Sequence, residues 1–362
     1  MEYILFLTYR CNLNCAYCFA KNYVQSESLH NCTLSQEMAN RICKYIETDI
    51  STNNRKDNSI VFFGGEPTLV PEIISLIMSN TEHLQTRYSI YTNGLLLEQM
   101  PADILGRLQT ILVAIDGDIE CHEHYKPKGS YERIVQQVSN IRKKTNAQLI
   151  ARITMEEETN IDLSVSNLLP HFDYVHWQIV NKESFNNSAL LLENYKNNVG
   201  SLFNKWLQFL REGIVLNIVP FNRIVHSMLT KDYSHSFRCG CGNSTQAIDV
   251  NGNIYLCDEY IEDPESSVGN ISEGRHNCIT YKSHYDIFPA CRTCDVSEIC
   301  KGRCRKCLET RSVSQIQNYC NLTKILLYMI RDSISEITDC LKKHNIPLAA
   351  LAKEIYKTEI IP

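Results

Sequence analysis

The chain has 362 residues, of which 44% are hydrophobic, and its 36 basic and 41 acidic side chains give a formal net charge of −5. This length and apolar content suit two or three domains with a full-sized core, and the absence of a long basic run argues against nucleic acid as a partner. No apolar run reaches the roughly 18 residues of a membrane span, and the N-terminus lacks the features of a signal peptide, so we expect a cytoplasmic protein with no membrane partner.

Strands and helices alternate along the first 180 residues. Short β-branched and aromatic runs predict strands at residues 3–9, 60–63, 87–92, 111–115, 148–154 and 174–180. Helical spacing of apolar residues predicts helices at residues 34–50, 71–79, 131–144 and 161–169. Six strands that alternate with helices in this way indicate a parallel sheet with right-handed crossovers. Since a closed barrel has eight units, we predict an α/β fold with a partial (β/α)6, TIM-like barrel over residues 1–181.

The remaining residues divide into three predicted parts. Residues 182–234 are expected to be a linker, with a polar loop at 182–200, a helix at 202–211 and a strand at 214–219. Over residues 235–325 cysteine and glycine are dense and hydrophobic periodicity fades, which predicts a domain held by metal rather than by an apolar core. Residues 326–362 form a predicted C-terminal helical segment, and its helix is expected to span residues 322–343.

Seventeen cysteines are far more than an ordinary chain contains. Because cytosolic thiols are kept reduced, clustered cysteines in an enzyme-sized chain indicate metal or iron–sulfur ligands. Cys11, Cys15 and Cys18 follow the first predicted strand, where barrel active sites lie. Three thiolates in one loop can hold three irons of a [4Fe-4S] cluster and leave the fourth iron open. The alternative is a structural zinc site with Cys32 as the fourth ligand.

The segment Cys11-Asn12-Leu13-Asn14-Cys15-Ala16-Tyr17-Cys18 resembles the signature of the radical SAM superfamily. Further landmarks of that superfamily follow in the same order over the first 180 residues: Gly64-Gly65-Glu66-Pro67, Tyr91-Thr92-Asn93-Gly94, Ile115-Asp116-Gly117 and Arg152.

The resemblance implies a site for S-adenosylmethionine (SAM). The open iron would chelate the amino and carboxylate groups of SAM, and Tyr17 would lie near the adenine. The carbonyls of Gly64 and Gly65, together with Glu66, would accept hydrogen bonds from the SAM ammonium, since glycine allows a close backbone approach.

Three later residues complete the implied SAM site. Asn93 and Asp116 would reach the ribose or the carboxylate, and Arg152 would pair with the carboxylate. Because Asn-Gly and Asp-Gly are also common turns, the alternative for Asn93 and Asp116 is that they are turn residues only. The superfamily usually has serine two residues before its Asp-Gly, whereas this chain has Ala114, so one polar contact to SAM is missing or replaced.

A second field of cysteines resembles the SPASM domain of radical SAM enzymes, which holds two auxiliary [4Fe-4S] clusters. The resemblance implies that the first auxiliary cluster is held by Cys239, Cys241, Cys257 and Cys304. It implies that the second is held by Cys291, Cys294, Cys300 and Cys320. The offset of Cys241 differs from that of other members, so an open iron at the first cluster is an alternative, and Cys307 is an alternative ligand. Two zinc sites with four cysteine ligands each fit eight thiolates equally well by count.

The segment Cys257-Asp258-Glu259-Tyr260 is similar to the Cys-Asp-x-Tyr of sulfatase-maturating radical enzymes. In those enzymes the aspartate is thought to take the substrate proton, and a carboxylate beside a cluster suits a general base. A solvated acidic turn is the alternative, because further acidic residues follow.

These resemblances imply an enzyme with three [4Fe-4S] clusters that cleaves SAM reductively to a 5′-deoxyadenosyl radical. We expect it to crosslink or desaturate a side chain of a ribosomally made peptide. Formylglycine-type oxidation of a Cys or Ser in a protein substrate is one alternative, and a non-catalytic zinc-bound scaffold is another. The expected partners are a peptide or protein substrate and a one-electron donor such as flavodoxin or ferredoxin. Because the chain begins at its first strand, we expect recognition of the substrate to be either internal or supplied by a separate leader-peptide-binding protein.

Overall fold

The computed structural model describes residues 1–18, 32–182, 184–231, 237–275, 282–353 and 361–362. The chain divides into two compact units, each built from several segments. The first unit comprises Met1–Ala114, Glu123–Leu149 and Gly240–Tyr281. The second comprises Ile115–His122, Ile150–Cys239 and Lys282–Pro362.

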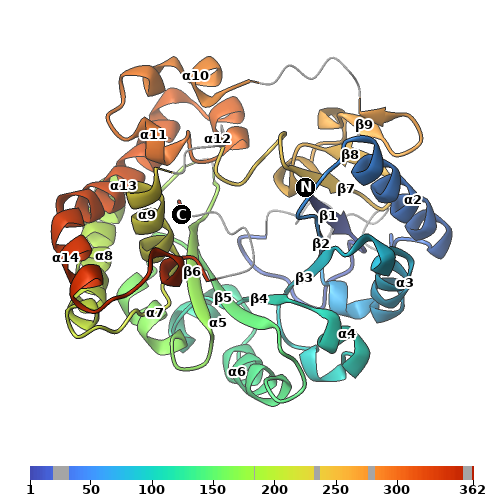
Figure 1. Ribbon diagram of the computed structural model, residues 1–362, viewed down its shortest axis with the longest axis horizontal. Coiled ribbons are helices and arrows are strands. Elements are labelled where there is room, and N and C mark those ends of the chain that lie inside the picture. Colours follow the sequence, from blue (N-terminus) through green and yellow to red (C-terminus); the bar gives the residue numbers. More distant parts are fainter. Residues whose placement is uncertain (19–31, 183, 232–236, 276–281, 354–360) are drawn as a thin grey trace. The chain divides into compact units, whose positions relative to one another are not determined.

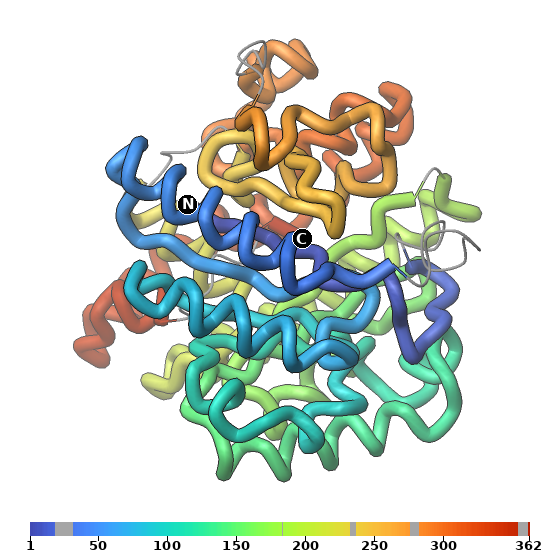
Figure 2. The backbone as a smooth tube through the Cα atoms, turned by 90° about the vertical axis from the view of Figure 1, so that its right-hand side faces the viewer, coloured from blue at the N-terminus to red at the C-terminus, as the bar shows by residue number. Residues whose placement is uncertain are grey.

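A parallel sheet organises the first unit (Figure 1). Its strands β1 (Glu2–Phe6), β2 (Ser59–Phe63), β3 (Arg87–Thr92) and β4 (Thr110–Ala114) pair in this order. All five residues of β1 are buried, as expected for a strand in a parallel sheet that helices cover. The covering helices are α2 (Gln36–Thr52), α3 (Pro71–Thr81), α4 (Ala102–Arg107) and α6 (Ser130–Ile141). Helices α2 and α3 pack side by side (Figure 2).

The sheet continues beyond β1 with strands from much later in the chain. Strand β7 (Thr245–Ile248) pairs with β1 in parallel, and β8 (Asn253–Tyr255), β9 (Gly269–Asn270) and β10 (Gly274–Arg275) follow in antiparallel pairs. Ile248, Ile254 and Tyr255 are buried. This part of the cysteine-rich segment therefore has an apolar core, contrary to the expectation that metal alone would hold it.

The second unit pairs β5 (Gln148–Met155), from Ile150 on, in parallel with β6 (Tyr174–Ile179). Around these strands lie α7 (Ile161–Leu168), α8 (Ser188–Arg211) and α9 (Val219–Thr230). Helices α13 (Val313–Asp332) and α14 (Ile334–Lys343) pack on α8. The late cysteines lie around three short helices, α10 (His284–Ile287), α11 (Ser297–Cys300) and α12 (Arg305–Thr310). The α/β fold with a parallel sheet is thus confirmed, and each of the six predicted strands is present.

Two predictions for the linker are wrong. The stretch 182–200 is not all loop, because α8 begins at Ser188, where the side chain of Asn187 accepts a hydrogen bond from the Leu190 N–H and so caps the helix. The stretch 214–219 is not a strand. Only Ile218 forms a β-bridge, with Val175, and α9 begins at the next residue because Pro220 suits the first turn of a helix.

The C-terminal helix also differs from the prediction. The helical segment starts at Val313, nine residues before the predicted start, and Ser333 separates α13 from α14. A capping box explains the earlier start: the Ser312 hydroxyl accepts from the Gln315 N–H, while the Gln315 side chain accepts from the Ser312 N–H. In the part of the chain that the structure describes, no helix is long and apolar enough to cross a membrane.

Candidate functional site

Three predicted cluster ligands lie in the loop that follows β1. Cys11, Cys15 and Cys18 are each half-buried. The Leu13 N–H donates to Cys11 Sγ (3.4 Å), and the Cys18 N–H donates to the Cys15 carbonyl (3.2 Å). Burial raises the pKa of Cys11 to about 12. A bound metal reverses this effect, because the thiolate is the form that ligates metal.

Residues beyond β4 hold this loop from one side. The Ala16 N–H donates to the Tyr125 carbonyl (3.1 Å), and the rings of Tyr17 and Tyr125 are 5.5 Å apart. Lys126 Nζ lies 5.8 Å from the centre of the Tyr17 ring and donates to the Ala114 carbonyl (2.8 Å). Only 6% of Lys126 is exposed, which is rare for lysine. No motif marked Lys126 or Tyr125 in the sequence, because only their packing against the loop reveals them.

The two glycines after β2 bring two stretches of backbone into contact. A Cβ at Gly64, which has a φ of 136°, would overlap the Thr8 carbonyl oxygen, and a Cβ at Gly65 would overlap the Arg10 carbonyl oxygen. The Gly65 N–H donates to the Thr8 carbonyl (2.8 Å). Glycine is therefore required here for packing against the segment that enters the cysteine loop.

The Glu66 side chain joins the ends of β2 and β3. It is fully buried at the start of η1 (Pro67–Leu69) and accepts hydrogen bonds from the Thr68 N–H (3.1 Å) and the Thr68 hydroxyl (2.6 Å). It also accepts from the Thr92 hydroxyl (2.7 Å) and the Asn93 N–H (2.7 Å). Burial raises the pKa of Glu66, and these four bonds oppose that rise. The sequence pointed to SAM for this carboxylate, whereas its contacts within the chain connect two strand ends.

Asn93 forms a turn and also contacts the cysteine loop. Its Oδ1 accepts from the Leu95 N–H (3.0 Å), which is the turn chemistry that the sequence left open. Its Nδ2 donates to Asn12 Oδ1 (2.7 Å), inside the cysteine motif. Asn93 can therefore stabilise its own turn and contact the cysteine loop at the same time.

Asp116 and Arg152 lie in the second unit. Asp116 is fully buried, and its Oδ1 accepts from the Thr154 N–H (3.0 Å) while its own N–H donates to His122 Nδ1 (3.1 Å). Arg152 is half-buried, with a guanidinium nitrogen 3.5 Å from Gln178 Oε1. Their roles as SAM contacts stay predictions.

Cys241 and Cys257 form a buried thiol pair in the first unit. A hydrogen bond with Cys241, together with burial, raises the pKa of Cys257 well above its usual range. The adjacency favours Cys241, whose spacing was the least typical, as a co-ligand of Cys257. Asp258 is half-buried and begins η4 (Asp258–Tyr260) directly after Cys257. Cys239 and Cys304, the other expected ligands of the first auxiliary cluster, belong to the second unit.

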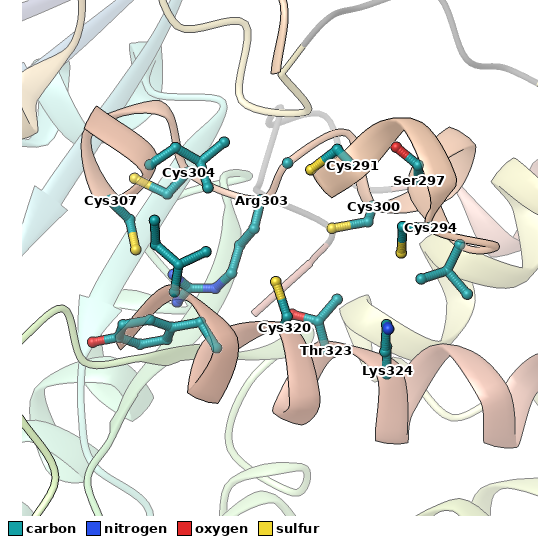
Figure 3. A pocket seen from close by; sticks show the side chains of 15 residues that line it. Cys291, Cys294, Ser297, Cys300, Arg303, Cys304, Cys307, Cys320, Thr323 and Lys324 are labelled. Carbon is teal, nitrogen blue, oxygen red and sulfur yellow. The ribbon is translucent and has the colours of Figure 1, made fainter. Parts of the chain in front are cut away.

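A pocket within the second unit is lined by six cysteines (Figure 3): Cys291, Cys294, Cys300, Cys304, Cys307 and Cys320. Burial raises the pKa of Cys291 to about 11 and that of Cys300 to about 12. In both cases the next largest cause is electrostatic repulsion from Cys320, so these three sulfurs lie near one another. The four cysteines that the sequence grouped as the second auxiliary cluster thus face one pocket, and Cys307 lines it too.

The donor atoms in this pocket fit an iron–sulfur cluster. Buried thiols surrender their protons when metal binds, and sulfur is the ligand that such clusters use. Among the described residues, no three His, Cys, Asp or Glu side chains could share a single metal ion as they are placed. In a four-iron cluster each thiolate binds a different iron, so its ligands lie farther apart than those of one zinc ion.

Comparisons with known proteins agree with this geometry. Residues 5–163 match the Radical SAM superfamily. The cysteine-type anaerobic sulfatase-maturating enzyme of Clostridium perfringens is 22% identical over 343 residues, which cover 87% of this chain and 91% of that enzyme.

Solved structures share the fold. The structure of native anSMEcpe with bound AdoMet superposes with a TM-score of 0.76 at 20% identity and covers 93% of this chain and 99% of its own. Streptococcus suis SuiB bound to its precursor peptide SuiA gives a TM-score of 0.58 at 15% identity, covering 84% of this chain and 71% of its own. Residues 5–163 of the chain therefore form a radical SAM domain, which contains the cysteine loop and the glycine pair.

Proposed function

We propose that this enzyme crosslinks or desaturates a side chain of a ribosomally made peptide. The observation that carries the proposal is the attachment of the cysteine loop and the segment that enters it to two strand ends, through Gly65 after β2 and Asn93 after β3. This attachment fixes three thiols beside the carboxyl ends of parallel strands, where barrel enzymes act. The similarity to SuiB, whose structure contains a precursor peptide, and to a sulfatase-maturating enzyme supports a peptide or protein substrate.

We assign three [4Fe-4S] clusters and SAM as cofactors. Cys11, Cys15 and Cys18 would hold a cluster that, when bound, would supply the electron for reductive cleavage of SAM and so for removal of a hydrogen atom from the substrate. The chain's own residues keep the loop in place: Glu66 orders the two strand ends, and Asn93 holds Asn12. Asp258, which directly follows Cys257, would accept the substrate's proton as the electron leaves.

Formylglycine formation in a protein substrate is a second candidate. The specific observation in its favour is the Cys257-Asp258-Glu259-Tyr260 segment, whose aspartate is half-buried beside the Cys241–Cys257 pair. The two candidates share SAM cleavage and differ in the product. A crosslink or desaturation removes two hydrogen atoms from the peptide without forming an aldehyde. Formylglycine formation gives an aldehyde, either from cysteine with loss of its sulfur or from serine with loss of two hydrogen atoms, so the aldehyde identifies this product.

The test is anaerobic reconstitution of the full chain with iron and sulfide, followed by incubation with SAM and dithionite. We expect about twelve irons per chain and formation of 5′-deoxyadenosine. The variant Cys11→Ala/Cys15→Ala/Cys18→Ala should hold about four fewer irons and form no 5′-deoxyadenosine. Persistent SAM cleavage by this variant, or a colourless zinc protein, would overturn the proposal.

Mass spectrometry of peptides encoded beside the gene then separates the two products. The same peptides can be supplied with flavodoxin or ferredoxin in place of dithionite, which tests the proposed electron donor. Adding the product of any neighbouring gene that binds the leader of the peptide tests the proposed recognition partner. Unmodified peptide in every combination, alongside active SAM cleavage, would contradict a peptide substrate.

A further inference from the structure

Arg303 lies in the six-cysteine pocket of the second unit, in the short loop between Cys300 and Cys304. Figure 3 shows its side chain between the Cys304/Cys307 pair on one side and Cys300 with Cys320 on the other. Only 8% of Arg303 is exposed. The pocket therefore contains a full positive charge among its thiols, because arginine does not lose its proton in proteins.

The backbone at Arg303 is held in an unfavourable conformation. Lys301, Gly302 and Arg303 all have positive φ values, of 54°, 74° and 57°. In the described part of the chain seven non-glycine residues have a left-handed backbone; five of these are exposed, and the two buried ones are Lys301 and Arg303. Glycine would relieve the strain, so the contacts of the Arg303 side chain must maintain the conformation.

Those contacts connect the loop with other parts of the second unit. The Arg303 guanidinium donates to the carbonyl of Ile179, at the end of β6 (3.1 Å), and to a main-chain oxygen of Pro362, the last residue of the sequence (2.7 Å). It also stacks over the Tyr319 ring, with 4.7 Å from its central carbon to the ring centre. Tyr319 directly precedes Cys320 in α13. The guanidinium is therefore fixed in place and cannot turn away into water.

The position of this charge affects the thiols of the pocket. Cys300, Cys304, Cys307 and Cys320 line the pocket on either side of this guanidinium. A fixed cation stabilises the more negative of two oxidation states, and the net charge around a cluster is one of the factors that set its reduction potential. Resting on the proposed function, we propose that Arg303 is a positioning residue that raises the reduction potential of the second auxiliary cluster and so favours transfer of an electron onto it.

The test uses the full chain with Cys11, Cys15 and Cys18 replaced by alanine, so that only the auxiliary clusters remain. Arg303→Gln removes the charge, and Arg303→Lys keeps the charge while losing the planar fork. Lys301→Gln is the matched control. It removes the same single positive charge from the other buried residue with a left-handed backbone, but Lys301 does not line the pocket and its Nζ is paired with Glu298 (3.3 Å). Iron content and a redox titration followed by electron paramagnetic resonance are measured for each.

We expect the potential of one auxiliary cluster to become more negative in Arg303→Gln and to stay near the parent value in Arg303→Lys and Lys301→Gln. Loss of iron from Arg303→Gln alone would also support the role of the charge. Equal potentials in the parent and Arg303→Gln, an equal shift in Lys301→Gln, or loss of iron from both Arg303 variants would overturn it. A parent that shows no iron–sulfur signal would instead contradict the proposed function.

Discussion

The side-chain amide of Asn93, at the end of β3, donates a hydrogen bond to the side chain of Asn12 in the cysteine loop (2.7 Å). The contact spans 81 positions of the sequence and connects the Cys11–Cys18 motif with the Tyr91–Gly94 motif. Since Asn93 Oδ1 also accepts a hydrogen bond from the Leu95 N–H, both polar atoms of the Asn93 side chain are held in place. The loop that carries the three thiols, which follows β1, is thus positioned by a residue that directly follows β3.

We predict that Asn93→Ala lowers iron retention at the N-terminal cluster and slows SAM cleavage without unfolding the chain. The loss of one hydrogen bond of this kind costs about 1 kcal/mol. Iron content and the rate of 5′-deoxyadenosine formation are the measurements. Asn12→Ala and the double variant complete a thermodynamic cycle. If the two single effects simply add, the contact does not position the loop.

Glu66→Gln should destabilise the first unit. The Glu66 side chain accepts from two backbone N–H groups and two hydroxyls, and the amide nitrogen of Gln would face one of these donors without accepting from it. A buried unsatisfied donor costs about 1–3 kcal/mol. Urea denaturation of the metal-free protein measures this change, with Glu72→Gln, on the first turn of α3, as a control. Equal unfolding midpoints for parent and Glu66→Gln would show that the carboxylate does not order the strand ends.

A third prediction concerns Lys182, which bridges Glu156 (2.7 Å) and Glu157 (2.8 Å) after β5. The Lys182 ammonium, the Asn186 N–H and the Asn187 N–H outweigh the effect of burial and hold the pKa of Glu157 below its usual value. A depressed carboxyl pKa gives stability that is present above the unfolded value of about 4.3 and is lost as the pH falls through the folded value.

Lys182→Met should therefore cost about 1 kcal/mol of unfolding free energy at pH 7, and less once the pH falls below about 4. Urea unfolding of the metal-free chain at a series of pH values checks both the size and the sign. Lys205→Met is a suitable control for a more exposed ion pair, with Asp162 (2.7 Å). A difference between parent and Lys182→Met that grows toward acid pH would contradict the assignment.

The alternation of strands and helices was predictable because strands buried on both faces read as continuous apolar runs. The spacing of Cys11, Cys15 and Cys18 was equally plain, since all three lie in one loop. Lys126 and the partners of Glu66 were not predictable, because their roles depend on contacts between segments that are distant in sequence. The first half of α8 was missed because its Asn-rich exposed face hides the few apolar residues that pack inward.

The last prediction concerns Asp258. The radical step needs the cysteine loop and SAM, whereas a base acts afterwards, when the substrate radical gives up a proton and an electron. Asp258 directly follows Cys257, which is paired with Cys241, so a proton acceptor lies beside the expected electron acceptor. Asp258→Asn keeps the shape and removes the base. It should still form 5′-deoxyadenosine, carrying deuterium from a labelled substrate, but yield little modified peptide. Glu262→Gln, in the acidic stretch that follows, is the matched control and should behave like the parent. If Asp258→Asn makes product at the parent rate, Asp258 is a turn residue, and formylglycine chemistry loses its main support.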